Sequence, residues 1–135
     1  MNQSLRAQVI SRAQGCCEYC RVSQDVDPIT FEVDHIIARK HRGQTVSDNL
    51  ALACFTCNNF KGPNVSGVDP ASGSIESLFH PRNDQWSDHF QWQGALLVGK
   101  TPSGRATVEV LEMNLSYRVG FRRELIDEGI FPPND

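Results

Sequence analysis

Two Cys-x-x-Cys pairs constrain the fold of this chain more than any other feature. Cys17-Glu-Tyr-Cys20 and Cys54-Phe-Thr-Cys57 are separated by 33 residues. A Cys-x-x-Cys turn brings two thiolates onto one ion, and two such turns complete the tetrahedral shell of a structural Zn²⁺. Binding of that ion contributes on the order of 10 kcal/mol to folding. The spacing therefore predicts a closed structural zinc site at Cys17, Cys20, Cys54 and Cys57.

The pairs have an alternative interpretation, which is a redox dithiol beside unrelated thiols. A redox motif is typical of a single pair in a βαβ pattern, whereas this chain has two matched pairs. The fifth cysteine, Cys16, can replace Cys17 in a Cys-x-x-x-Cys spacing, but we interpret it as a small apolar neighbour. An odd number of cysteines also argues against a disulfide framework.

The composition predicts one soluble globular domain that spans residues 1–135. Of the 135 residues 39% are apolar and 21% are charged. No apolar run approaches the roughly 18 residues that a membrane-spanning helix needs. The first residues, Met1 to Arg6, lack the apolar stretch of a secretory signal. We therefore expect a cytoplasmic protein without a membrane partner.

The charge is distributed unevenly along the chain. The net charge is −3, but residues 1–62 carry seven basic and six acidic side chains, whereas residues 63–135 carry six and ten. The overall charge gives no argument for nucleic-acid binding. Any contact with a polyanion is therefore expected from the first half.

Hydrophobic periodicity places short elements around the two cysteine pairs. Apolar residues at positions 5, 9, 10 and 13 predict a helix over 4–14. The β-branched segment 29–37 predicts a strand, and the alternating run 50–53 predicts a second, antiparallel strand. Residues 58–61 are expected to form a short helix closed by Gly62-Pro63. The predicted order is strand, loop, strand and helix, with the zinc site at its edge.

Residues 64–135 predict an extension packed on this core, with no separate function. A strand is expected at 96–99, and helices at 102–113 and 117–128. The pair Asp88-His89 is followed by no further cysteine pair, so we reject it as a second centre. The aromatic side chains of this half are expected in the core rather than as base-stacking platforms; they are Trp86, Phe90 and Trp92.

Three polar motifs follow one another in the first half: Asp34-His35, Asn49-Leu50 and Cys54-x-x-Cys57-Asn58-x-x-Lys61. Their order resembles the His-Asn-His (HNH) endonuclease family. The resemblance covers residues 14–63 and implies an α+β fold with a small ββα-metal core. It departs from the family at the third motif position, where Asn58 replaces His, yet an amide oxygen can still ligate a hard cation. The tail from Val68 onward resembles the extension of free-standing bacterial members.

The residues of these motifs suit metal-dependent hydrolysis of a phosphodiester. His35, with an ordinary pKa of about 6.5, can take a proton from an attacking water. Asp34 and Asn58 offer hard oxygen ligands to a catalytic Mg²⁺ or Mn²⁺ ion, which stabilises the transition state and the leaving 3′-oxygen. Because neighbouring residues on a strand point to opposite faces, Asp34 and His35 are expected at a strand end or on opposite sides of the phosphate. The resemblance implies that Asn49 ties the loop and orients His35.

Each of these assignments has a structural alternative. Asp34-His35 can be a solvated acid beside a structural histidine, and Asn49 can cap a turn after Asp48. Asn58 can be the N-cap of the short helix. Lys61 either contacts phosphate or covers the helix end.

Basic side chains near the motifs are the expected contacts to nucleic acid. Arg39, Lys40 and Arg42 lie just after His35, with His41 among them. Phosphate contacts of this kind bind the backbone without reading sequence, although a charge run is more often a merely solvated loop. The further candidates are Lys61, His80 and Arg82, of which His80 can alternatively reach the metal.

These observations predict a metal-dependent endonuclease that acts on DNA and leaves 5′-phosphate and 3′-hydroxyl ends. One alternative is a zinc-ribbon module that binds nucleic acid without chemistry, and another is a purely structural or interaction domain. Asp34, His35 and Asn58 discriminate among them, because a pure zinc ribbon needs none of these residues.

Overall fold

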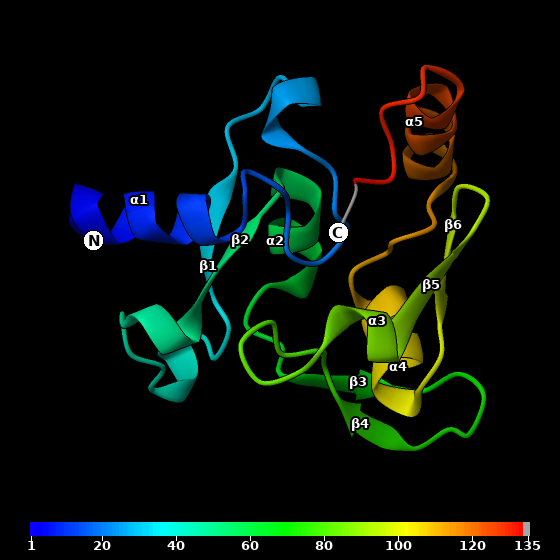
Figure 1. The fold of residues 1–135 in the computed structure, drawn as a ribbon. Helices are drawn as coiled ribbons and strands as arrows, with labels where there is room; N and C mark the ends of the chain where they lie inside the picture. Colours follow the sequence, from blue (N-terminus) through cyan, green and yellow to red (C-terminus); the bar gives the residue numbers. More distant parts are fainter. Residues whose placement is uncertain (134–135) are drawn as a thin grey trace.

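A computed structural model describes residues 1–133 as a mixture of short helices and two-stranded sheets (Figure 1). All three sheets are antiparallel pairs. The expected α+β class is confirmed. In the described residues no helix is both long and apolar enough to cross a membrane. The elements are α1 (Gln3–Arg12), β1 (Glu32–His35), β2 (Leu50–Ala53), α2 (Phe55–Lys61), β3 (Ser66–Val68), β4 (Ile75–Ser77), α3 (Trp86–His89), β5 (Phe90–Gln93), β6 (Leu96–Gly99), α4 (Pro102–Val110) and α5 (Ser116–Asp127), with 3₁₀ turns η1 (Gln24–Val26), η2 (Arg39–His41) and η3 (Ser47–Asn49).

The strands β1 and β2 and the helix α2 form the expected ββα core. Asp34 pairs with Ala51, and His35 pairs with Leu50. Every residue of β2 is buried, because α1 packs against this strand and the cluster of apolar side chains surrounds it. The core lies beside the N-terminal helix, and the later elements lie on the other side of α2 (Figure 1).

The first strand is shorter than the predicted segment 29–37. At its start, the Gln24 side chain accepts a hydrogen bond from the Phe31 N–H and donates one to the Ile29 carbonyl, so a side chain takes the place of a partner strand. At its end, the Ile37 N–H bonds the Asn49 side chain instead of a strand. Side-chain partners at both ends therefore limit β1 to four residues.

The helices of the core also differ from prediction at their ends. α1 stops at Arg12 rather than 14, because Gln14 and Gly15 adopt left-handed backbone conformations. α2 begins at Phe55 rather than 58, because the Cys54 sulfur accepts a hydrogen bond from the Cys57 N–H and caps the helix. The second cysteine pair thus starts α2, and Gly62 ends it as expected.

The extension contains two hairpins and three helices. The strand 96–99 is confirmed as β6, whereas the β3–β4 hairpin, α3 and β5 were not predicted. α4 begins at Pro102 under a Thr101 cap and ends at Val110 rather than 113, and it packs on β3, β4 and β6. α5 lies within one residue of its predicted bounds at each end.

Aromatic side chains of the extension stack on one another and reach the core. Phe90 is buried, and Trp86 and Trp92 are partly buried against it, as expected for core residues. The Trp86 indole N–H donates to the Tyr19 carbonyl at 2.9 Å. The extension therefore packs against the first cysteine turn, while the division into units 14–63 and 64–135 stays a prediction.

Candidate active site and zinc-type centre

The four cysteines of the two pairs converge on one point. Their sulfur atoms all lie within 4.8 Å of one another, and all four residues are buried. The Cys20 and Cys54 sulfurs are 3.8 Å apart, close to the about 3.8 Å that a tetrahedron with Zn–S distances of about 2.3 Å gives. The donor set fits zinc, and the predicted cluster is confirmed as a zinc-type site. Cys16 lies outside it, partly exposed in a bridge to Ser23.

A buried arginine from α5 lies against this cluster. One guanidinium nitrogen of Arg118 donates to the Cys57 sulfur at 3.0 Å, and the other donates to the carbonyl oxygens of Leu111 and Glu112. Burial alone lowers the pKa of Arg118, but the nearby sulfurs of Cys57, Cys20 and Cys54 outweigh it and raise that pKa. A tetrathiolate zinc carries two net negative charges, so the guanidinium offsets part of the charge of the centre.

Asp34, near the end of β1, is buried rather than solvated. Its side chain is 4% exposed. The Tyr19 hydroxyl donates to Oδ2 at 2.7 Å, and the Lys61 ammonium lies 3.2 Å from the same oxygen. Burial raises the pKa of Asp34, and the Lys61 charge and the Tyr19 hydrogen bond oppose that rise. The alternative of a solvated acid is therefore wrong.

Lys61 is not the surface phosphate contact that was considered for it. The residue is 1% exposed, and its ammonium donates to the Asp34 carboxylate and, at 3.2 Å, to the His35 carbonyl. The reason is that Lys61 is the last residue of α2, a helix that packs against β1. Lys61 thus fixes the end of the strand that carries the candidate base.

His35 is partly exposed at the end of β1. Its Nε2 lies 2.8 Å from the Thr45 hydroxyl oxygen, whereas Asp34 faces Tyr19 and Lys61. The two neighbours therefore have separate partners, as strand alternation predicts. Burial lowers the pKa of His35, and the positive charge of Arg39 lowers it further. Both effects favour the neutral imidazole.

The Asn49 side chain holds the loop between the two strands. Its amide nitrogen donates to the carbonyl oxygens of Ile37 and Gln44, and its oxygen accepts from the Ile37 N–H at 2.9 Å. Gly43 lies so close to this network that a Cβ there would overlap the Ile37 carbonyl oxygen. Asn49 therefore holds the loop next to His35. A catalytic role for Asn49 stays a prediction.

Asn58 lies inside α2 rather than at its N-cap, which is Cys54. The N-cap alternative is therefore wrong. Residues three apart lie on the same side of a helix, so Asn58 shares a side with Lys61, whose ammonium contacts Asp34. An amide and a carboxylate are hard donors suited to Mg²⁺. Apart from the four cysteines, no group of three or more His, Cys, Asp or Glu converges within residues 1–133.

The remaining candidate contacts to nucleic acid differ in exposure. Arg39, Lys40 and Arg42 are exposed on and just after η2, and none of them is in an ion pair with a residue of the described chain. Arg82 is instead turned inward to an ion pair with Glu18. Arg82 is thus corrected from a free phosphate contact to a link between the extension and the first cysteine turn.

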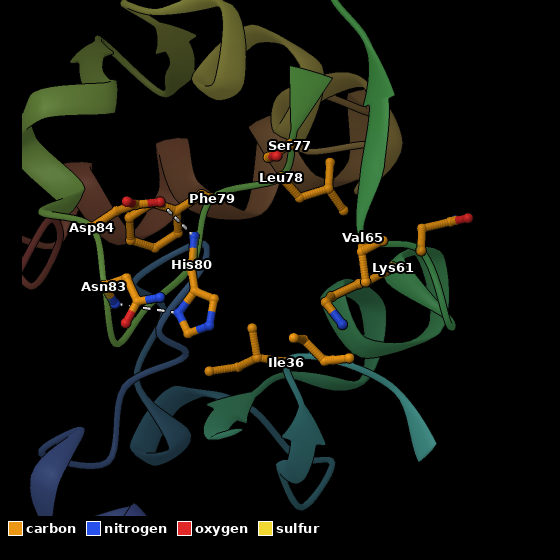
Figure 2. Close-up of a pocket in the computed structure, with 11 residues that line it drawn as sticks. Ile36, Lys61, Val65, Ser77, Leu78, Phe79, His80, Asn83 and Asp84 are labelled. Atoms are coloured by element: carbon orange, nitrogen blue, oxygen red, sulfur yellow. Dashed lines mark hydrogen bonds between the residues drawn. The ribbon is translucent and has the colours of Figure 1, made fainter. Parts of the chain in front are cut away.

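His80 lines a cavity of about 370 Å³ next to Lys61, between the core and the extension (Figure 2). Its Nδ1 lies 3.2 Å from the backbone N–H groups of both Arg82 and Asn83, so this nitrogen is the acceptor. The ring proton of the neutral form is therefore on Nε2. A nitrogen that carries a proton cannot ligate a cation, and this geometry favours a phosphate contact over the metal contact considered for His80.

Comparison with known proteins agrees with this geometry. Residues 17–64 match the model of the HNH endonuclease family. This segment is an HNH domain. Septu protein PtuB of Bacillus thuringiensis is 27% identical over 124 residues, which are 90% of this chain and 46% of that protein. CRISPR-associated endonuclease Cas9 of Corynebacterium diphtheriae is 35% identical over 77 residues, 54% of this chain and 7% of that protein.

The chain thus spans less than half the length of either of these relatives. No solved structure gives a significant match to it. The match of residues 17–64 to the HNH endonuclease family supports nuclease activity in general terms.

The candidate site and the cysteine cluster contain contacts that sequence reasoning missed. Tyr19 was visible only as an aromatic residue between two cysteines, and Arg118 lies 61 residues from the cysteine that it contacts. A tyrosine beside a predicted metal turn gives a weak local signal. Nothing in the local sequence distinguishes Arg118 from the neighbouring Arg122 and Arg123.

Proposed function

We propose that this chain is a metal-dependent endonuclease that hydrolyses phosphodiester bonds of DNA and leaves 5′-phosphate and 3′-hydroxyl ends. One observation carries the proposal: the buried Asp34, bound by Tyr19 and Lys61, lies next to a partly exposed histidine at the end of β1. A zinc ribbon needs no such pair. The family match over residues 17–64 supports the same reaction class.

In this proposal His35 is the general base. When its Nε2 donates to the Thr45 hydroxyl, its Nδ1 presents a lone pair to a water molecule. The lowered pKa keeps the ring neutral at neutral pH, so it can accept the proton of the attacking water. Asn49 holds the following loop, and Lys61 holds the His35 carbonyl, so the backbone that carries the ring is held on both sides of the residue.

Asp34 and Asn58 are the proposed ligands of Mg²⁺ or Mn²⁺. When bound, such a cation supplies positive charge to the phosphate and to the leaving 3′-oxygen. The Lys61 ammonium lies against the same carboxylate and adds a fixed positive charge at this place. The exposed Arg39, Lys40 and Arg42 contact the DNA backbone in a salt-dependent way.

The test is cleavage of supercoiled plasmid DNA in Mg²⁺ or Mn²⁺ by wild type and by His35→Ala. Loss of a general base lowers the rate by about 10² to 10⁴-fold, while DNA binding, measured by fluorescence anisotropy, persists. Glu32→Ala is the matched control, because Glu32 is exposed on the same strand; it should cut like wild type. Equal rates for His35→Ala and wild type would show that His35 is not the base. If wild type binds DNA and cuts none, the chain is a binding module.

A further inference from the structure

The cavity beside Lys61 has the two ends that a nucleotide requires. Ile36, Leu78 and Phe79 form buried apolar walls, while Ile37 and Val65 line its mouth at 42% and 43% exposure. Its volume of about 370 Å³ lies at the lower end of the range of small-molecule sites, about 300–1,000 Å³. Apolar walls of this size suit a sugar and a base rather than a bare ion.

The polar end of the cavity has one free donor, on His80, beside the buried positive charge of Lys61. Figure 2 shows His80 and Lys61 pointing into the cavity from opposite sides, one from the extension and one from α2. With Nδ1 of His80 occupied by two backbone N–H groups, Nε2–H is the atom free to donate. Asp84 also lines the cavity, but one of its carboxylate oxygens already accepts a hydrogen bond from the backbone N–H of His80.

The cavity is also adjacent to the candidate reaction centre. The Lys61 ammonium that borders it lies 3.2 Å from both the Asp34 carboxylate and the His35 carbonyl oxygen. Ile36 and Ile37, which line it, directly follow the candidate base. The cavity and the candidate reaction centre therefore share the end of β1 and the Lys61 side chain.

We propose that the cavity receives one nucleotide of the DNA strand, turned out of the base stack, with its phosphate toward the Nε2–H of His80. This inference rests on the proposed nuclease function and specifies its substrate class as single-stranded or locally unpaired DNA. A base inside an intact duplex is stacked and paired, so it enters such a cavity only after leaving the stack. The amides of Asn64 and Asn83 at the cavity lining offer both donors and acceptors to the freed base edge.

The first test compares three DNA substrates that share one strand: the single strand, its perfect duplex and a duplex with a central bulge of unpaired bases. Because unpairing is least costly in a strand that is already unpaired, we expect the single strand and the bulge to be cut about tenfold faster or more. Equal or faster cleavage of the perfect duplex would overturn the inference and leave the nuclease proposal intact.

The second test fills the cavity. Val65→Trp places a large side chain at its mouth, and Val68→Trp is the matched control, because Val68 is 53% exposed on β3 and does not line the cavity. We expect Val65→Trp to bind the single strand about tenfold more weakly in fluorescence anisotropy, with Val68→Trp unchanged. Equal affinities of the two variants would contradict the inference. This readout also decides the matter if wild type proves to cut no DNA, in which case the nuclease proposal alone has failed.

A third variant protects the test against misfolding. Asn83→Ala removes an exposed polar group of the cavity without adding bulk. Zinc content and thermal midpoint should match wild type in all three variants. If Val65→Trp fails that check, a weakened affinity of Asn83→Ala for the single strand supports the inference, and an unchanged affinity overturns it.

Discussion

Tyr19 connects the zinc-type centre to the candidate active site at the level of one side chain. It lies between two of the clustered cysteines, is almost fully buried, and donates its hydroxyl to Asp34 at 2.7 Å. The cysteines and Asp34 were predicted from spacing and motif, whereas this hydrogen bond was not. It joins residues 15 apart through a side chain whose local context indicates only an apolar core position. Local sequence predicts the cysteine cluster, but it does not predict the contact that orients Asp34.

The Tyr19→Phe substitution tests this connection. It leaves the ring in place but removes a hydrogen bond to a buried charged group, which costs about 1.5–3 kcal/mol. We expect urea unfolding to show a loss of this size and zinc content to stay at one equivalent. We also expect slower DNA cleavage, because Asp34 then depends on Lys61 alone. An unchanged unfolding free energy would contradict the role given to this hydroxyl.

Among the elements, β1, β2 and the loop between them show what a local sequence pattern predicts and what it does not. The order strand, loop, strand and helix was predicted correctly, because alternation and turn residues are local signals. The ends of β1 were wrong, because Gln24 and Asn49 satisfy backbone groups that a partner strand otherwise takes. Hydrogen bonds from side chains to the ends of a strand do not change the alternation of apolar and polar residues, so the sequence does not reveal them.

The loop requires a residue without a Cβ atom at Gly43. Gly43→Ala forces the Ile37 carbonyl or the Asn49 amide to move, which we expect to cost about 1–3 kcal/mol. Faster hydrogen exchange at the Ile37 N–H and slower cleavage should accompany that loss. Gly120→Ala is the matched control: it lies within α5 with open space around it, so the variant should gain about 0.5–1 kcal/mol. Equal changes in the free energy of unfolding for the two substitutions would show that Gly43 does not lie this close to the Ile37 carbonyl.

At the scale of the whole molecule, contacts far apart in sequence join the extension to the cysteine turns. Trp86 bonds the Tyr19 carbonyl, Arg82 pairs with Glu18, and Arg118 contacts Cys57. The sequence predicted that the extension packs on the core, from its apolar content alone. It could not predict these pairings, because no local pattern links residues more than 60 positions apart.

Arg118→Met tests whether the extension supports the metal. The substitution keeps much of the side-chain length and removes the donor to the thiolates, and lost outer-shell partners lower metal affinity about 10–100-fold. We expect faster zinc release to a chelator, followed by absorbance. Arg123→Met, exposed on the same helix, should release zinc like wild type. Identical release from both variants would show that α5 packs on the centre without stabilising it.

The position of Tyr19 also gives the proposed nuclease function a dependence on zinc supply. Because Tyr19 lies between Cys17 and Cys20, the turn that carries two of the clustered sulfurs is the same turn that orients the Asp34 carboxylate. On the proposed function, we therefore expect protein expressed without zinc to gain cleavage activity only after the metal is added.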